Sequence, residues 1–461
     1  MIKLLAETPR DQEMIDKFQR AYNNLKKIVD RLQEENRKLR EELDEYRKRH
    51  PANVGVKNGK TYDIRQENAS TETESTGKRK PGAQPGHIGH FRKTPAATER
   101  IFLKAKRFRC PVCHSRLQKN GTTGRKIEDI PEIKPRVVEY EIERMICRTC
   151  GNIYEPDVAE AFPGARISVR AMLIVAYFRT AMRMSIENVS NTIREIFGLS
   201  VSEGEIQNIL SELSESLDER YENLLLEVRN APSRNMDSTS SRISGENYNL
   251  WVFVTKGEAI FHTSKSNSHD VPLTVLGKHE GTDVHDRHSA FETLARKTGN
   301  DQQYCWSHII SDAKELEQFY GEEGGRIKRS LRRIYREGLS FHGHGTMEDV
   351  DRLHEKLIFL IDSDYDHKKC RNFVDNLLKR KKEWLFKFVM DPHVEGTNNR
   401  AERALRPFVI YRKVSGGFRS HAGARAHDII FSQYYTSKIR KENFIRDTPA
   451  VMTRKKSPKP G

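Results

Sequence analysis

Three acidic residues lie where the sequence pattern changes from one predicted element to the next. Asp237 precedes a polar turn and an apolar, strand-like run, Asp286 follows a short apolar run, and Glu402 lies on a predicted helix. Each acid alone is typical of a turn, a helix cap or a surface charge. Together they offer the hard oxygen ligands with which two Mg²⁺ (or Mn²⁺) ions, roughly 3.5 to 4 Å apart, align the attacking and leaving oxygens of a phosphoryl transfer.

Basic residues surround the third acid. The segment TNNRAERALRPFVIYRKVSGG places Arg403, Arg406, Arg412 and Lys413 after Glu402. Cations beside a phosphoryl-transfer site would bind the phosphate backbone of a nucleic acid. These four residues are therefore the predicted DNA-binding residues of the site.

Two cysteine hooks have the spacing of a zinc site. Cys110 and Cys113 form the first hook, and Cys147 and Cys150 form the second. Four thiolates close the tetrahedral shell of Zn²⁺ and leave no open position, so this ion would be structural. The residues between the hooks alternate apolar and polar side chains as β-strands do, which predicts a zinc ribbon over residues 101–160.

The composition indicates an anionic partner. The 461 residues include 81 Lys and Arg against 65 Asp and Glu, a formal net charge of +16, and nucleic acid is the leading candidate. The longest apolar run, AMLIVAYF, is too short for a membrane span, and the N-terminus lacks the apolar core of a secretion signal. We expect a cytoplasmic protein without a membrane partner, in which disulfides are rare.

Residues 11–48 carry a heptad pattern that predicts a coiled coil. The polar Asn36 at a seam position favours a parallel, two-stranded register, so we expect a homodimer or a higher oligomer. A long helix docked on its own domain is the alternative. Residues 51–100 are polar, contain Gly, Pro and basic residues, and predict a linker.

Residues 161–216 read as helices with a helix-turn-helix layout. One helix runs through Val189, Ile193 and Ile196, Gly198 breaks it, and Ser202 caps a second helix. This layout is typical of a DNA-binding region, although two short helices around a glycine also occur in helical bundles.

Several motifs together resemble one protein family. They are GAQPGHIGH, CPVC with CRTC, MDST before NLWVFV, VHDRHSAF, CWSH, and TNNRAERALRPFVIYRKVSGG. The chain resembles the transposases of the Insertion Sequence 66 type over nearly its whole length, most specifically around NNRAERALRP. The resemblance implies a DDE-type, ribonuclease H-like catalytic domain over residues 230–440, with Asp237, Asp286 and Glu402 as its metal-binding triad. It also implies a mainly helical insertion at about 310–390, before a basic tail over 441–461.

The expected fold is therefore multidomain α/β, with a coiled coil, a zinc ribbon, a helix-turn-helix and then the catalytic domain. The resemblance implies a DNA transposase that binds the terminal inverted repeats of its element, cleaves the ends and joins them to target DNA. A non-catalytic zinc-ribbon and helix-turn-helix regulator is the alternative, as is an intact fold without activity. Magnesium-dependent nicking of an element end would distinguish the enzyme from the regulator.

Some residues leave alternatives open. Asp283 competes with Asp286 for the role of second acid, and the chain has Ser238 and Phe291 where the family commonly has an acid and an aromatic hydroxyl. A second zinc site is open for two further pairs, which are Cys305 with His308 and His367 with Cys370. The resemblance instead implies that His308 helps to order the active site, and Cys370 has the pattern of a core thiol.

Overall fold

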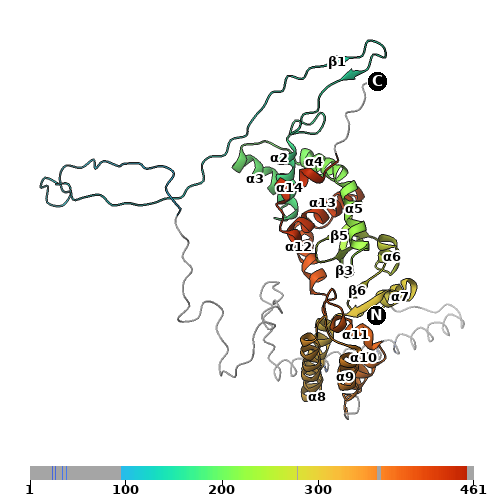
Figure 1. The fold of residues 1–461 in the computed structure, drawn as a ribbon. Coiled ribbons are helices and arrows are strands. Elements are labelled where there is room, and N and C mark those ends of the chain that lie inside the picture. Colours follow the sequence, from blue (N-terminus) through green and yellow to red (C-terminus); the bar gives the residue numbers. More distant parts are fainter. Residues whose placement is uncertain are drawn as a thin grey trace, which may run out of the picture. The chain divides into compact units, whose positions relative to one another are not determined.

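The computed structural model describes residues 95–277, 279–360 and 365–453, together with Asn23, Lys26, Glu34 and Lys38. The chain divides into two units, Met1–Lys126 and Ile127–Gly461, and each is described by itself (Figure 1). The coiled coil predicted over 11–48 lies outside the described residues, apart from those four, which are helical. Only residues 95–100 of the predicted linker are described. Within the described ranges, no helix is long and apolar enough to cross a membrane.

A short hairpin lies near the start of the second unit. Strand β1 (Met145–Ile146) pairs antiparallel with β2 (Ile153–Tyr154). The alternating pattern predicted longer strands for the zinc ribbon, but residues 127–144 form no helix or strand. Apolar side chains such as Ile130 and Val137 are exposed there. The alternation therefore has no core to pack against among the described residues of this unit.

Helices α2 (Val169–Thr180), α3 (Ile186–Phe197), α4 (Glu203–Ser216) and α5 (Asp218–Arg229) follow. The predicted break between α3 and α4 is confirmed. Gly198 ends α3 in the left-handed conformation with a φ of 66°, which glycine adopts without strain. The Ser202 side chain accepts a hydrogen bond from the backbone N–H of Glu205 and caps α4.

The surface of α4 does not have the charge of a DNA-reading helix. Its sequence contains Glu203, Glu205, Glu212 and Glu215 and neither lysine nor arginine. Acidic side chains repel DNA phosphates. DNA contact by the α3–α4 pair stays a prediction, and the charge of α4 opposes it.

A mixed, five-stranded sheet forms the centre of the second unit. Its strands are β3 (Ser233–Ile243), β4 (Glu246–Val254), β5 (Ala259–Ser264), β6 (Thr282–His285) and β7 (Asp301–Tyr304). Their order is β5-β4-β3-β6-β7, where β3, β4 and β5 pair antiparallel and β3, β6 and β7 pair parallel. Helices α6 (Asp270–Leu276) and α7 (Ser289–Thr298) flank β6 in the chain. The predicted hairpin partner GEAIFHTS is confirmed as β5.

The polar turn predicted directly after Asp237 is wrong. β3 continues to Ile243, so Asp237 lies in the middle of a strand. The turn lies at Ser244 and Gly245, whose φ values of 50° and 84° fit a tight hairpin turn. Pairing with the apolar strand β4 along its whole length overrides the low strand propensity of the polar β3 sequence.

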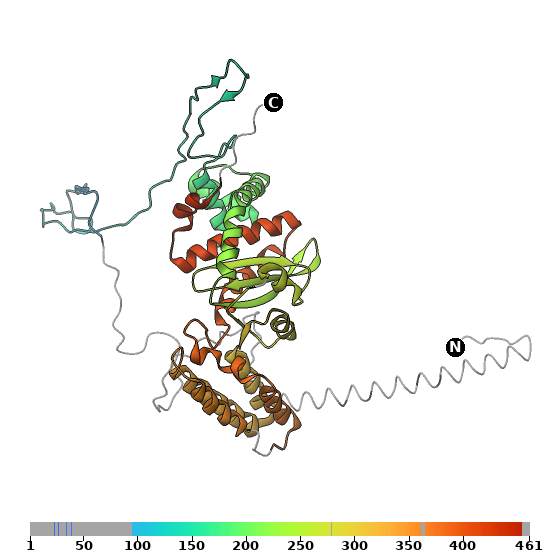
Figure 2. The ribbon, with the colours of Figure 1, turned by 45° about the vertical axis from the view of Figure 1, so that its right-hand side comes forward.

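A helical insertion separates β7 from the last part of the unit, as predicted. It consists of α8 (Trp306–Ser340), α9 (Met347–Ile358), α10 (Lys368–Leu378) and α11 (Lys382–Met390). These helices are grouped together (Figure 2) and share a core that includes Leu331, Leu353 and Phe388. Helix α11 packs against β7, which attaches the insertion to the edge of the sheet.

Helices α12 (Asn399–Ser415) and α13 (His421–Arg440) complete the sheet's cover. Alternate residues of β4 face two cores: Val252 packs with Leu405 of α12, whereas Phe253 packs with residues of α2, α4 and α5. The predicted boundary between a helical region at 161–216 and a catalytic domain from 230 is therefore not observed. One shared core joins these segments because the apolar faces of the helices are buried on the sheet.

The predicted basic tail over 441–461 needs a correction. Helix α14 (Phe444–Asp447) and the 3-10 helix η2 (Thr448–Val451) lie within it. Helix α14 packs against α2, and Phe444 is buried in their core. An aromatic side chain in an otherwise charged segment anchors the chain here. Residues 454–461 lie outside the described residues.

Candidate active site

Two of the predicted acids come from neighbouring parallel strands, since Asp237 lies on β3 and Asp286 directly follows β6. Asn235 of β3 pairs with Val284 of β6, and the same register continued by two residues brings Asp237 level with Asp286. Neighbouring strands are about 4.8 Å apart, so the two carboxylates come close although they are far apart in the sequence. Asp237 accepts a hydrogen bond from the N–H of Ser238 at 2.7 Å, and Asp286 accepts one from the N–H of His288 at 3.0 Å.

A buried asparagine fixes the helix that carries the third acid. Asn398, directly before α12, donates from Nδ2 to the carbonyl of Met236 at 2.8 Å. Its Oδ1 accepts a hydrogen bond from Asn235 at 3.2 Å. Asn398 is fully buried, so these two bonds, to adjacent residues of β3, hold the start of α12 against that strand. Glu402 lies one turn later and is thereby held above the strand that carries Asp237.

The electrostatics of Asp237 confirm that the three acids influence one another. Burial, followed by the carboxylates of Asp286 and Glu402, raises the pKa of Asp237 from its ordinary 3.8 to about 7. His308 partly opposes this effect. The carboxylates of Asp286, at the end of β6, and of Glu402, on α12, therefore add negative charge to the surroundings of Asp237 on β3.

His308 and Cys305 extend this cluster at the start of α8. His308 Nδ1 lies 3.7 Å from Glu402 Oε1, and ligand atoms of Cys305, His308 and Glu402 all lie within 4.8 Å of one another. A hydrogen bond with Cys305, followed by the nearby carboxylates, raises the pKa of His308 to about 9. The imidazolium is thus the cation that faces the three acids from this side.

Sequence reasoning missed the part that Asn398 and Cys305 play. The buried Cys305 accepts a hydrogen bond from the backbone N–H of Asn398 through its sulfur at 3.0 Å, so β3, α8 and α12 meet at Asn398. The doubled asparagine in TNNRAER was a usable signal, because asparagine is common at helix starts. Its burial between three elements depends on tertiary packing and could not be read from the sequence.

Asp283, the alternative second acid, lies in a different environment. It is fully buried and pairs with Arg234 Nε at 3.3 Å, and His279 Nε2 lies 3.2 Å from both of its oxygens. In the register of β3 and β6, Asp283 pairs with Arg234, and the next pair is Val284 with Asn235. The Asp283 carboxylate is already neutralised by a cation, unlike that of Asp237.

The two cysteine hooks adopt the same local turn. In the first hook, the N–H of Cys110 donates to Ser115 and the N–H of His114 donates to Cys110. In the second, Cys147 stands in the same relation to Asn152 and Gly151. His114 and Gly151 have positive φ values of 60° and 71°.

In each hook, hydrogen bonds lower the pKa of one thiol. A hydrogen bond with Ser115 lowers the pKa of Cys113 to about 7, and backbone hydrogen bonds lower that of Cys147. Lower thiol pKa values favour the thiolate that zinc requires. Cys110 and Cys113 belong to the first unit, and Cys147 and Cys150 belong to the second. The four-cysteine zinc site stays a prediction.

The candidate ligands of a second zinc site contact other residues. His367 contacts Glu323 at 2.5 Å, and Cys370 is buried in the core of the insertion. Among the described residues, the cluster that could hold a metal joins Cys305 and His308 with Glu402. These contacts give each pair a separate local role.

The predicted DNA-binding residues of α12 differ in exposure. Arg403 and Lys413 are exposed, whereas Arg406 and Arg412 are half-buried. Arg412 donates from Nη1 to the Ser240 hydroxyl at 2.5 Å and also to its carbonyl. Arg412 thus ties α12 to β3, and its role in binding DNA stays a prediction like that of the other three.

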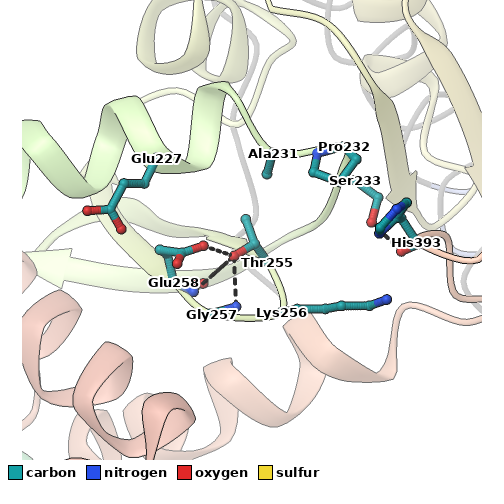
Figure 3. Close-up of a pocket in the computed structure, with 9 residues that line it drawn as sticks. All are labelled: Glu227, Ala231, Pro232, Ser233, Thr255, Lys256, Gly257, Glu258 and His393. Carbon is teal, nitrogen blue, oxygen red and sulfur yellow. Dashed lines mark hydrogen bonds between the residues drawn. The ribbon is translucent and has the colours of Figure 1, made fainter.

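A hollow of about 460 Å³ lies apart from the acids, at the start of β3 and the turn between β4 and β5 (Figure 3). Polar groups around it are engaged within the protein. The Thr255 hydroxyl accepts hydrogen bonds from the N–H groups of Gly257 and Glu258, and Lys256 donates to the carbonyl of Pro392 at 3.1 Å. The hollow therefore lies between the sheet and the segment that follows the insertion. None of the predicted site residues lines it.

The sequence was compared with known families and proteins. No curated protein matches the chain significantly. The family described as Transposase IS66 family matches residues 164–426, more than half of the chain. The matched region contains the three acids, the sheet and the whole helical insertion. The chain belongs to the IS66 family of transposases.

Proposed function

We propose that the chain is a DDE-type transposase in which Asp237, Asp286 and Glu402 hold two Mg²⁺ (or Mn²⁺) ions. Family membership makes it an enzyme that acts on nucleic acid, with DNA as its partner. The observation that carries the finer proposal is the cluster of three carboxylates from separate segments, whose mutual repulsion and burial raise the pKa of Asp237 to about 7.

The fold supports this proposal. The order β5-β4-β3-β6-β7, with an antiparallel hairpin series followed by two parallel strands, is the arrangement expected of a ribonuclease H-like domain. The insertion lies between the second and third acids, as the family resemblance implies. Ligands in sheets with parallel strands commonly bind beyond the carboxyl ends of the strands, and Asp286 lies there.

The donor set fits divalent magnesium or manganese. Carboxylate oxygens are hard ligands, which these ions prefer. The acids repel one another, and His308 offers one opposing charge. A divalent cation would offset the remaining negative charge. When bound, the ions would activate a water or a 3′-hydroxyl and stabilise the leaving oxygen.

The residues of the chain prepare the site for this chemistry. Asn398 and Cys305 hold α12 and α8 against β3, so that Glu402 keeps its place relative to Asp237. The backbone N–H groups of Ser238 and His288 orient the two aspartates. Preorganised ligands need no rearrangement during the reaction, which favours the transition state.

The remaining parts would serve end recognition and assembly. We propose that the cysteine hooks bind a structural Zn²⁺, that the N-terminal region helps to bind the terminal inverted repeats, and that the coiled coil pairs two protomers. Pairing would bring two element ends together before cleavage. The lowered thiol pKa values of Cys113 and Cys147 support the zinc assignment.

The test is cleavage of labelled DNA that carries the end of the element, with and without Mg²⁺. We expect nicking in Mg²⁺, joining of the new 3′ end to a second duplex, and neither reaction in EDTA. A protein that binds the end specifically but never nicks it in Mg²⁺ or Mn²⁺ would instead be the non-catalytic regulator. Inverted repeats in the DNA flanking the coding region would supply the substrate.

A further inference from the structure

Helix α8 carries a row of arginines on one face. Arg329, Arg332, Arg333 and Arg336 are spaced three, one and three residues apart, which places them on adjoining rows of one helix side. We call these four residues the arginine face of α8. The opposite side of the helix contains Leu331, which is buried in the core of the insertion.

Most of this positive charge has no acidic partner. Arg333 and Arg336 are exposed and Arg332 is half-buried. In the described part of the chain these three make no hydrogen bond or ion pair, whereas Arg329 pairs with Glu322. Unpaired cations at neighbouring positions of a helix repel one another. Their accumulation is favourable when an anion binds across them.

A hollow of about 210 Å³ lies between α8, which carries the arginine face, and α12, which carries Glu402. Tyr335 and His342 line it from α8 and the following loop, and Asn399 and Arg403 line it from α12. Arg332 and Arg336 lie on α8 three residues before and one residue after Tyr335. Arg403 adds an exposed cation on the other side.

The hollow and the third acid share helix α12. Asn399 and Arg403 lie four residues apart on one side of α12, and Glu402 is the neighbour of Arg403. The Ser307 hydroxyl donates to the Asn399 side chain at 3.2 Å, which joins the start of α8 to the start of α12 as well. Cations thus lie on both helices that line the hollow, as the arginine face on α8 and as Arg403 beside Glu402 on α12.

We propose that the arginine face of α8 and the hollow beside it bind the sugar-phosphate backbone of the DNA strand next to the scissile phosphate. This inference rests on the proposed function, because it names where the DNA of that active site lies. The arginine face is about 10 Å long from Arg329 to Arg336, which spans about three phosphates of one strand at 3.4 Å each. Helix α4, predicted to read DNA, is acidic by contrast.

The experiment compares the full-length wild type with three variants in binding to duplex DNA that contains the element end, over a range of salt concentrations. One variant loses the unpaired charge (R332Q, R333Q and R336Q together). A second keeps it (R332K, R333K and R336K). A control variant removes three exposed cations from elsewhere on the insertion (R352Q, K368Q and K369Q).

The glutamine variant should reduce the salt slope by about two to three units, because each phosphate contact contributes about 0.9. The lysine variant and the control should keep the slope of the wild type. All three should fold normally, since exposed substitutions change stability little, and circular dichroism checks this. An unchanged slope in the glutamine variant, or an equal loss in the control, would overturn the proposal.

A second measurement locates the contact on the DNA. Neutral methylphosphonates at the three phosphates beside the scissile one should weaken binding by the wild type and leave the glutamine variant unaffected. The proposal would be overturned if the methylphosphonates weakened DNA binding by both proteins equally. It would also be overturned if the glutamine variant bound DNA normally but no longer dimerised, because the arginine face would then bind an acidic protein partner. Failure of the wild type to nick in Mg²⁺ concerns the proposed function alone, because the binding measurements need no cleavage.

Discussion

Two aspartates on neighbouring strands of the same sheet have opposite environments. Asp283 on β6 is fully buried and faces Arg234 and His279. Asp237 on β3 is half-buried and faces two further carboxylates, with His308 as the opposing cation. One position is electrostatically complete within the chain, whereas the other carries excess negative charge.

This difference shows why burial alone does not identify a functional acid. A buried acid that is paired with its own cation needs no external charge, and removal of either partner destabilises the fold because it leaves an uncompensated buried charge. A cluster of acids with little compensation costs stability unless an external cation binds, and such clusters occur at functional sites. If this distinction holds, replacement of Asp237 should mainly reduce catalysis and replacement of Asp283 should mainly reduce stability.

Replacement of Asp237 should give the largest effect, on catalysis. In Asp237→Asn, one hard ligand and one negative charge are lost, so cleavage and strand transfer should fall by at least about 10³-fold, equivalent to about 4 kcal/mol of transition-state stabilisation. Binding of the element end should remain within about two-fold of the wild type. The measurement is single-turnover nicking beside an end-binding titration. Strand transfer at the normal rate would remove Asp237 from the proposed role.

Replacement of Asp283 should affect the fold instead. Asp283→Asn keeps the shape of the side chain but leaves the buried Arg234 without its counter-charge. Breaking a buried ion pair by removing one partner costs about 3 to 5 kcal/mol of stability. Chemical denaturation measures this loss, and an Arg234→Met, Asp283→Leu double variant that recovers part of it serves as the control. A fully stable Asp283→Asn protein with no cleavage would exchange the roles of the two aspartates.

Local signals predicted much of the fold. Apolar periodicity and cap residues gave the helices before and after Gly198, and the alternating run after Asp237 gave the β4–β5 hairpin. Family motifs predicted the helical insertion, and the role of the three acids that they suggest stays a prediction. These features depend on spacing along the chain, which the sequence displays directly.

Features that depend on tertiary packing could not be predicted. β3 is polar, and only its pairing with β4 and the cover of α12 make it a strand. The separate helical domain was not found because the helices and the sheet share one core. Helix α4 has the spacing of a recognition helix but the wrong charge, and the network of Asn398 joins segments far apart in the sequence.

Replacement of Asn398 should produce an intermediate effect that connects fold and site. Asn398→Ala removes two side-chain hydrogen bonds, to Met236 and Asn235, and leaves buried polar groups unpaired. The expected loss of stability is about 2 to 3 kcal/mol. Because α12 then loses its attachment to β3, kcat should fall while affinity for DNA stays near normal. Asn443→Ala, which removes the exposed side chain that caps α14, is a matched control and should leave kcat unchanged.

The smallest expected effect is the pH dependence of stability at Asp237. Folding raises its pKa from 3.8 to about 7, so the folded protein favours the protonated acid, and ionisation destabilises it progressively as pH rises from about 4 to about 7. Without metal, Asp237→Asn should therefore become more stable than the wild type across this window, by an amount on the order of 2 kcal/mol once solvent screening at the half-buried site is allowed for. Above pH 7 the difference should stay constant.

Added Mg²⁺ should raise the melting temperature of the wild type at pH 8 more than that of the variant, because binding to the folded state stabilises it. A difference between the two proteins that does not change from pH 4 to pH 8, or an equal response to Mg²⁺, would mean that Asp237 is as well compensated as Asp283.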